Sequence, residues 1–486
     1  MNRINLLATA TLAAALALGW SPASWAGDPP SGDSAQPAAP QPAATPQPTA
    51  DQRLQELEKE VSALQQEIAA LKEENTPGVK TGALALPDPS ASPAAFGAGG
   101  AAPADEAPKI NLASLLGPVT LSGFGDVYYS YNSNHPFNNQ SGLRFFEAPT
   151  NGFAFNMAEL ILDKAPDATT AESRLGYHVS AGYGQAAKVV NGSDMPPFAD
   201  GSNFFLKEAY LSYLAPVGKG LTITVGKFVT NAGAEVIETD SNWNYSHSLL
   251  FYYAIPYFHF GAKAAYTFNP KWSANVSLVN GWNNTIINHN SGIFGASSGL
   301  TYGVSATYTP TMKWSVAENY YVGPVTAGFL VSGATNNYWR HLTDTVIGYT
   351  PNAKWAFQLN GDYGFFQDAP ISGANYWGLA GYGKYTWTPK TNFAVRYEYV
   401  SDPSALIGLL TQPDGAFFSG HAQEVTGTIS HNFTSNLLTR LEYRYDFASV
   451  PIFAEGQSFG SPNALVKTQS TVYLGFIYQF SSANMK

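Results

Sequence analysis

Near the end of the chain, apolar side chains occupy every second position. One face of this stretch is apolar and aromatic throughout and consists of Val472, Leu474, Phe476, Tyr478 and Phe480. Side chains alternate between the two faces of an extended strand, so the pattern predicts a strand with one continuous apolar face. Such a face suits lipid, and its aromatic end suits the boundary between membrane and water. The alternative is the last strand of a soluble sandwich.

Charged residues in other strand-like stretches take the parity opposite to the apolar one. An Arg or Lys that faces lipid near mid-bilayer costs about 2–4 kcal/mol, so these charges should face a watery interior. The predicted pore-lining residues are Asp126, Glu159, Arg174, Glu208, Lys263, Asp362, Lys384, Arg396, Glu398, Glu424, Arg440, Glu442, Arg444 and Asp446. Alternatively, many of these charges pair across neighbouring strands and brace the wall.

Turn signals recur about every 40 residues, at Pro270, Pro310, Pro351 and Pro389. A propeller or a solenoid has a similar period. However, each unit combines a short turn flanked by aromatic residues with a longer polar connection, which is typical of outer-membrane barrels. The pattern predicts an all-β fold: a transmembrane antiparallel barrel of about sixteen strands, with fourteen or eighteen as alternatives. The strand centres are expected near residues 125, 158, 179, 210, 224, 263, 277, 304, 319, 345, 360, 382, 396, 427, 443 and 476.

Composition agrees with alternating strands. Charged residues make up 12% and aromatic residues 14% of the chain, and the net charge is −10. Strands that mix a lipid face with a wet face give only average hydropathy. The negative charge argues against nucleic acid as a partner. The chain has no Cys, which rules out disulfides and thiolate metal sites.

The N-terminal region divides into four segments by composition. Residues 1–26 are typical of a secretory signal peptide, and residues 27–50 of a Pro- and Ala-rich disordered linker. Residues 51–75 predict a periplasmic coiled coil, and an Ala-, Gly- and Pro-rich linker (76–108) leads to the barrel (109–486). The heptad core consists of Leu54, Leu57, Val61, Leu64, Ile68 and Leu71. Self-association of several copies would bury this heptad core, and we favour a trimer over a dimer. The alternative is a single helix that packs on its own barrel.

One long connection, residues 231–256, is aromatic and apolar. Ser246 is a candidate cap for a short helix that Pro256 ends. The segment is expected to fold into the lumen as a constriction loop or to pack against a neighbouring subunit. The residues expected at a constriction are Trp243, Tyr252 and Tyr253, and ordinary loop packing is the alternative.

Four segments carry a family resemblance: residues 226–230, 233–238, 243–256 and 279–284. Together they resemble the OmpL-like family of β-barrel porins. The resemblance implies a porin-type barrel in the bacterial outer membrane, surrounded by lipid, and supplies no catalytic residues. The spacing of Gly475, Tyr478 and Phe480 resembles the C-terminal signal that addresses such barrels to the barrel assembly machinery, although here it is internal. The heptads resemble those of certain sugar-specific porins.

An enzyme is the weaker interpretation. Residues 295–299 match G-x-S-x-G but lack the strand–turn–helix context of a hydrolase. The eight His residues are scattered, so we expect no catalytic residue, no metal and no cofactor. The sequence predicts a passive diffusion channel for small hydrophilic solutes such as ions and sugars. The alternatives are a structural barrel tethered to the periplasm by its coiled coil, and an outer-membrane hydrolase.

Overall fold

A computed structural model describes residues 119–191, 203–287, 299–326, 337–369, 373–413, 415–456 and 464–482. The predicted signal peptide, the two linkers and the heptads lie outside these residues. So does most of the G-x-S-x-G match. The remaining description therefore concerns the barrel.

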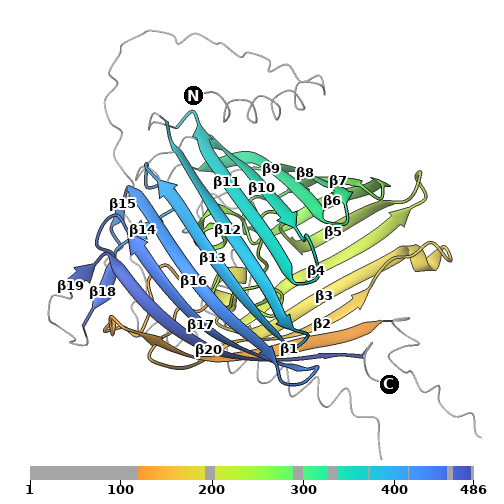
Figure 1. Ribbon diagram of the computed structural model, residues 1–486. Helices are drawn as coiled ribbons and strands as arrows, with labels where there is room; N and C mark the ends of the chain where they lie inside the picture. Colours follow the sequence, from red (N-terminus) through yellow and green to blue (C-terminus); the bar gives the residue numbers. More distant parts are fainter. Residues whose placement is uncertain are drawn as a thin grey trace, which may run out of the picture. The chain divides into compact units, whose positions relative to one another are not determined.

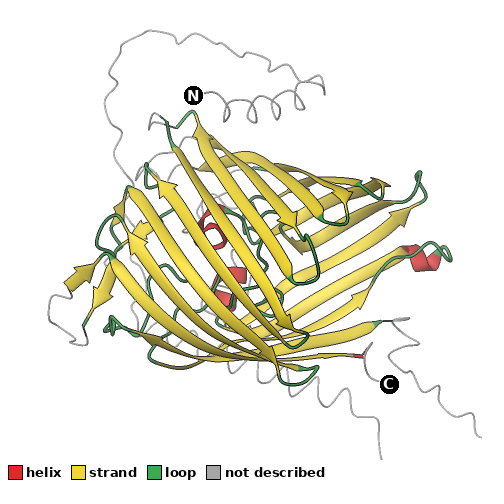
Figure 2. Cartoon of the chain, viewed as in Figure 1, coloured by secondary structure: helices red, strands yellow, loops and turns green. Residues whose placement is uncertain are grey.

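Within the described residues, sixteen strands close into one antiparallel barrel (Figures 1 and 2). The predicted fold class and strand number are confirmed. The strands are β1 (Thr120–Asn132), β2 (Gly152–Lys164), β3 (Leu175–Gly184), β4 (Phe204–Ala215), β5 (Leu221–Val229), β6 (Phe258–Asn269), β7 (Trp272–Val279), β8 (Thr301–Thr311), β9 (Trp314–Thr326), β10 (Asn337–Tyr349), β11 (Trp355–Gln367), β12 (Asn375–Thr388), β13 (Thr391–Asp402), β16 (Gly420–Asn432), β17 (Leu437–Ala448) and β20 (Thr468–Ser481).

Each strand pairs with its neighbour in sequence order, and β20 closes the barrel on β1, with Asp126 opposite Ile477. Closure leaves no free sheet edge, so every strand can satisfy its backbone in lipid. Two small hairpins lie in the connections: β14 (Leu410–Thr411) with β15 (Phe417–Phe418), and β18 (Phe453–Glu455) with β19 (Ala464–Val466). The helical segments are η1 (Glu172–Arg174), α4 (Ala187–Val190) and η2 (Leu250–Ala254). None of the helices among the described residues is long and apolar enough to cross a membrane.

The two faces of the wall follow the predicted alternation. In β20, Leu474 and Phe476 are exposed on the outside, whereas Tyr473 and Ile477 are buried inside. The same alternation runs through β13, where Arg396 and Glu398 are buried between exposed apolar positions.

Aromatic side chains cluster beside the short turns. The rings of Trp272 and Tyr308 stack with centroids 4.2 Å apart, and those of Trp314 and Tyr349 at the same distance. All four residues belong to strands that end at these turns, as expected for an interfacial girdle.

The connections at the opposite end are longer, and among the described residues the β1–β2 and β5–β6 connections contribute many buried side chains inside the barrel. We call residues 133–151 the β1–β2 loop and residues 230–257 the β5–β6 loop. Figure 2 shows helix and loop segments inside the ring of strands. Much of the barrel's buried apolar cluster consists of these two loops, including Phe146 and residues 249–255.

Candidate functional site

The β5–β6 loop forms a compact structure inside the barrel. Its π-helical turn η2 begins at Leu250, and the Oγ of Ser248, two residues earlier, accepts a hydrogen bond from the Phe251 N–H at 3.0 Å. The serine that binds an N–H of this turn is therefore Ser248, and the prediction that Ser246 caps it was wrong. The turn ends at Ala254, two residues before Pro256, as the proline predicted.

Two glutamates of the wall each bind two successive backbone N–H groups of this loop. The Glu442 carboxylate on β17 accepts from Tyr245 N at 2.5 Å and from Ser246 N at 2.9 Å. Glu398 on β13 accepts from Leu249 N at 2.6 Å and from Leu250 N at 3.1 Å. A loop without regular pairing leaves backbone donors unsatisfied, and these buried carboxylates satisfy them.

Three arginines of the same wall bind the loop's carbonyl groups. Arg440 donates to the Asn244 carbonyl at 3.0 Å and also to the carbonyls of Thr239 and Asn242. Arg444 donates to the His247 carbonyl at 2.5 Å, and Arg396 donates to the Ser246 carbonyl at 2.7 Å. We call these three arginines together with Glu398 and Glu442 the loop clamp.

Ion pairs hold the loop clamp together and extend it to both loops. Arg396 lies 2.6 Å from Glu424 on the neighbouring strand and 2.7 Å from Glu235 of the β5–β6 loop. Arg144 of the β1–β2 loop lies 2.7 Å from Asp446. These groups are nearly or completely buried, and removing one partner of a buried pair leaves a charge without compensation.

An ion pair and a hydrogen bond join the β1–β2 loop directly to the β5–β6 loop. His247 Nδ1 lies 2.8 Å from Glu147 Oε1, and the Tyr252 hydroxyl also donates to Glu147. Burial favours the neutral form of both groups. However, His247 holds the pKa of Glu147 below its ordinary 4.5, and Glu147 holds the pKa of His247 above its ordinary 6.5.

This pair therefore stabilises the folded state within a defined pH range. The raised pKa of His247 contributes stability that is complete below pH 6.5 and is lost as the pH rises through its folded value. The lowered pKa of Glu147 contributes stability above pH 4.5 that is lost as the pH falls through its folded value.

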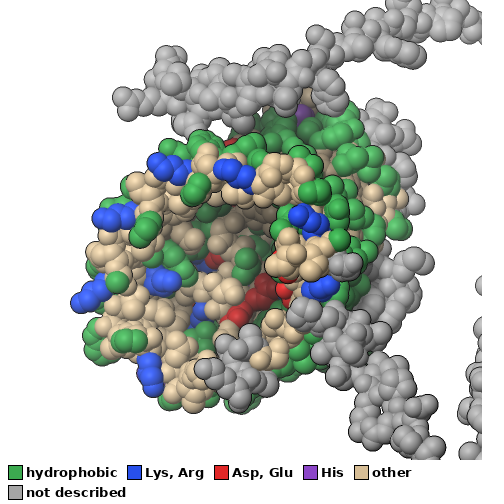
Figure 3. Space-filling model, turned by 90° about the vertical axis from the view of Figure 1, so that its right-hand side faces the viewer, with side chains coloured by type: hydrophobic (Ala, Val, Ile, Leu, Met, Phe, Trp, Pro, Cys, Tyr) green, Lys and Arg blue, Asp and Glu red, His purple; other side chains and the backbone are tan. Residues whose placement is uncertain are grey.

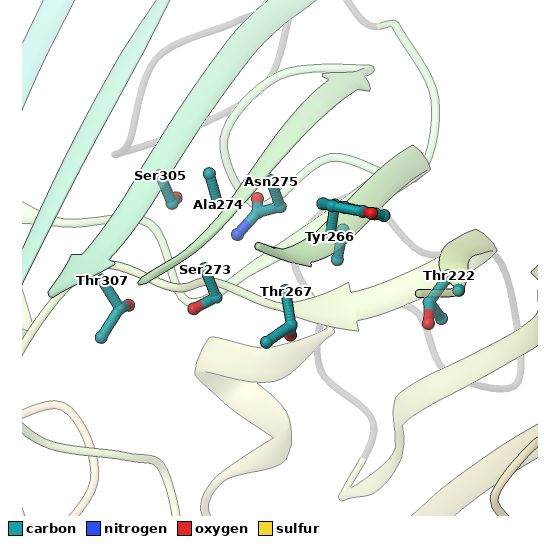
Figure 4. A pocket seen from close by; sticks show the side chains of 10 residues that line it. Thr222, Tyr266, Thr267, Ser273, Ala274, Asn275, Ser305 and Thr307 are labelled. Atoms are coloured by element: carbon teal, nitrogen blue, oxygen red, sulfur yellow. The ribbon is translucent and has the colours of Figure 1, made fainter. Parts of the chain in front are cut away.

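The opposite wall, from β5 to β8, is uncharged where it borders a cavity of about 240 Å³ (Figure 4). Asn231, at the start of the β5–β6 loop, donates to Asn275 at 3.1 Å and to Ser305 at 3.3 Å. The lining is mostly hydroxyl and amide groups, and comprises Gly220, Thr222, Ala265, Tyr266, Thr267, Ser273, Ala274, Asn275, Ser305 and Thr307.

Figure 3 shows that one end of the barrel is hollow, with Lys and Arg side chains around the rim and acidic side chains inside. Exposed lysines occur in successive short turns, namely Lys219, Lys271, Lys313, Lys354 and Lys390. The lumen therefore combines a charged wall that holds a loop with an uncharged cavity lining on the opposite wall.

Comparison with known proteins places the chain in a family. Residues 118–480 match the model of the family described as "Putative beta-barrel porin-2, OmpL-like". The chain belongs to this porin family. It is thus an outer-membrane channel for small solutes. A search of curated proteins finds no match.

Solved structures of similar shape are also porins and channels. An anion-selective porin from Comamonas acidovorans is 11% identical with a TM-score of 0.51, over 75% of this chain and 99% of that one. The outer-membrane channel DcaP of Acinetobacter baumannii is 12% identical with a TM-score of 0.48, over 74% of this chain and 97% of that one. At this identity, the likeness to the Comamonas protein concerns the fold alone.

In the porin, the three aromatic residues expected at a constriction lie in different surroundings. Tyr252 and Tyr253 are buried and pack on Phe145 of the β1–β2 loop, with ring centroids 5.6 and 5.0 Å apart. Trp243 is half-buried, and the Lys384 Nζ lies 4.7 Å from its ring centroid. The two tyrosines thus join the loops together, and only Trp243 is partly accessible.

The remaining charged residues of the prediction occupy several places in the porin. Asp126 also holds the β5–β6 loop, through the Thr239 hydroxyl at 2.7 Å. Asp362 is buried beside Asn360. Arg174 lies outside the strands, in η1, where it donates to the Leu214 carbonyl at 2.9 Å.

The other three residues lie on the wall from β2 to β6. Glu159 pairs with Lys207 at 2.5 Å, and Glu208 contacts His178 at 3.3 Å. Lys263 Nζ lies 4.6 Å from the Phe228 ring centroid.

Sequence reasoning missed the charged residues of the two loops. Arg144, Glu147, Glu235 and His247 complete the network that holds the porin's loops. The available signal was the presence of charges within otherwise aromatic loop segments. A buried charge there requires a partner, and the strand charges of opposite sign were the candidates.

Proposed function

We propose that small hydrophilic solutes diffuse passively through this porin, past the β5–β6 loop and along the wall of β5 to β8. One observation carries the proposal: the loop clamp draws the loop to the opposite wall, and the cavity borders the uncharged wall. A sixteen-stranded barrel is wide enough for an aqueous passage beside such a loop.

The lining favours neutral, hydroxyl-rich solutes over strongly charged ones. Each Ser or Thr hydroxyl both donates and accepts, as does the Asn275 side chain, so the wall can replace the water around a sugar. At about 240 Å³ the space is smaller than the ~300–1,000 Å³ typical of ligand pockets. It suits one small solute unit at a time, and small ions pass with their water.

The test is reconstitution of the purified protein into bilayers and vesicles. We expect discrete current steps and glucose-driven swelling of vesicles. The variant Thr222→Val/Thr267→Val/Thr307→Val keeps shape and strand propensity but removes three hydroxyls from the cavity wall. Each lost hydrogen bond is worth about 0.5–1.5 kcal/mol, so the glucose rate should fall about twofold or more while the salt current persists.

The matched control is Thr471→Val on β20, a buried inward threonine away from the cavity. It should leave the glucose rate unchanged. If folded protein gives no current steps, the channel proposal fails. If steps occur but the triple variant and the control behave alike, only the path along β5 to β8 is wrong.

The finer assignments follow from the same interpretation. The porin performs no catalysis, and lipid surrounds its exposed apolar belt. The β20 strand addresses the chain to the barrel assembly machinery. The N-terminal heptads form a periplasmic coiled coil that joins several copies, with a trimer favoured. If a serine-reactive probe labels the folded protein, the assignment without catalysis is wrong.

A further inference from the structure

Acidic residues of the barrel strands face inward, with one exception. Among the Asp and Glu residues of the sixteen described strands, only Glu318 on β9 has outward register. Its neighbour Asn319 is buried inside, opposite the buried Asp344. Glu318 lies opposite Thr345, whose hydroxyl donates to Glu318 Oε2 at 2.6 Å on the outer surface.

A carboxylate at the depth of Glu318 raises the free energy of the barrel in the membrane. Trp314, at the start of β9, is exposed and belongs to the aromatic girdle. Four residues of a tilted strand rise about 10 Å, so Glu318 lies well inside an apolar band of roughly 25 Å. Its two methylene groups cannot carry the carboxylate back to water. Ionisable groups at such depth usually have a protein partner.

Small residues flank the polar pair of Glu318 and Thr345 on the outer surface. Ala306 lies on one side of Glu318, and Gly361 lies on the far side of Thr345. Small side chains allow another protein surface to approach the wall closely. One step further from the girdle, the Tyr320 hydroxyl lies 2.7 Å from His341 Nδ1. We call Ala306, Glu318, Tyr320, His341, Thr345 and Gly361 the β8–β11 patch.

We propose that the β8–β11 patch is a contact surface for a second copy of this chain. Acyl chains offer no hydrogen-bond donor to a carboxylate, whereas another protein surface does. The heptads of residues 54–71 independently predict that copies of this chain associate. A donor from the second copy completes the coordination of the Glu318 carboxylate, and the small side chain of Ala306 allows the two surfaces to approach closely. The proposal does not depend on which solute the porin carries.

A single photoreactive label tests which surface meets another copy. The chain has no Cys, so Ala306→Cys can be labelled uniquely with benzophenone maleimide in the purified protein. Illumination in lipid vesicles should give covalent dimers. The control is Leu441→Cys on β17, an exposed outward position nearly opposite on the barrel. Lipid adducts alone at position 306, or equal dimer yields from both positions, would overturn the proposal.

Glu318→Leu provides the second measurement. Leu suits lipid, so the barrel should still fold and insert. Loss of a hydrogen bond to a charged acceptor should lower the association constant about tenfold or more in sedimentation measurements. The control Thr439→Leu, outward on β17, should leave association unchanged. If Glu318→Leu associates as strongly as the native chain, the patch faces lipid and the proposal is wrong.

Discussion

Glu442 provides the sharpest test of how the β5–β6 loop is held. Its carboxylate accepts from Tyr245 N at 2.5 Å, from Ser246 N at 2.9 Å and from the Thr428 hydroxyl at 2.7 Å. Glu442→Gln keeps the size of the side chain but replaces one acceptor oxygen with a donor. At least one backbone N–H of the loop then loses its partner and meets an NH₂ group.

The expected magnitude follows from these contacts. A hydrogen bond to a charged group contributes about 1.5–3 kcal/mol. Losing one such bond raises the population of the detached loop roughly 10- to 150-fold, because each 1.4 kcal/mol is a factor of ten. Glu398 and the arginines still hold the loop, so detachment should be brief rather than permanent.

Single-channel recording provides the assay. Glu442→Gln should show frequent brief steps to a larger conductance, while the native porin stays at one level. The control Asp163→Asn removes an inward carboxylate that binds His178 instead of the loop. The single-channel traces of Asp163→Asn should match those of the native porin. Identical traces from Glu442→Gln and native protein would refute the role of the loop clamp.

Three further predictions concern separate features. Raising the pH through the folded pKa of His247 should weaken its pair with Glu147 and increase current noise, and His247→Gln should abolish this pH dependence. Trp314→Ala should lower the free energy of unfolding, measured in urea, because its ring no longer stacks on Tyr349. The loss should exceed the effect of the lost buried area by about 0.5–1.5 kcal/mol. Trp314→Phe should recover part of this free energy. Gly182→Val should prevent assembly, measured as heat-modifiable migration on gels, because its Cβ would collide with the β2 backbone.

The strand pattern could be predicted because the bilayer acts on each residue separately. Leu474 and Phe476 meet hydrocarbon while Arg396 and Glu398 do not, and a period of two separates them in any barrel of this kind. Local signals also supported the number of strands, since the turns at Pro270, Pro310, Pro351 and Pro389 each combine a proline with flanking aromatic residues.

The candidate site was only partly predictable. The sequence identified an aromatic connection at residues 231–256 and charges of inward parity, but it did not say that they bind each other. Register decides this, because Glu442 and Glu398 lie nearly 200 and nearly 150 residues, respectively, from the backbone N–H groups whose hydrogen bonds they accept.

The sequence by itself determined which side of the wall most strand residues face, because that choice depends mainly on parity and on the difference between lipid and water. The tertiary structure alone decided what the inward charges do. Closing the barrel brings the β5–β6 loop against one wall, where its backbone groups cannot reach enough water. Five of the charges predicted to line the passage bind that backbone: Arg396, Glu398, Arg440, Glu442 and Arg444. The cavity that remains lies beside the neutral hydroxyls of β5 to β8.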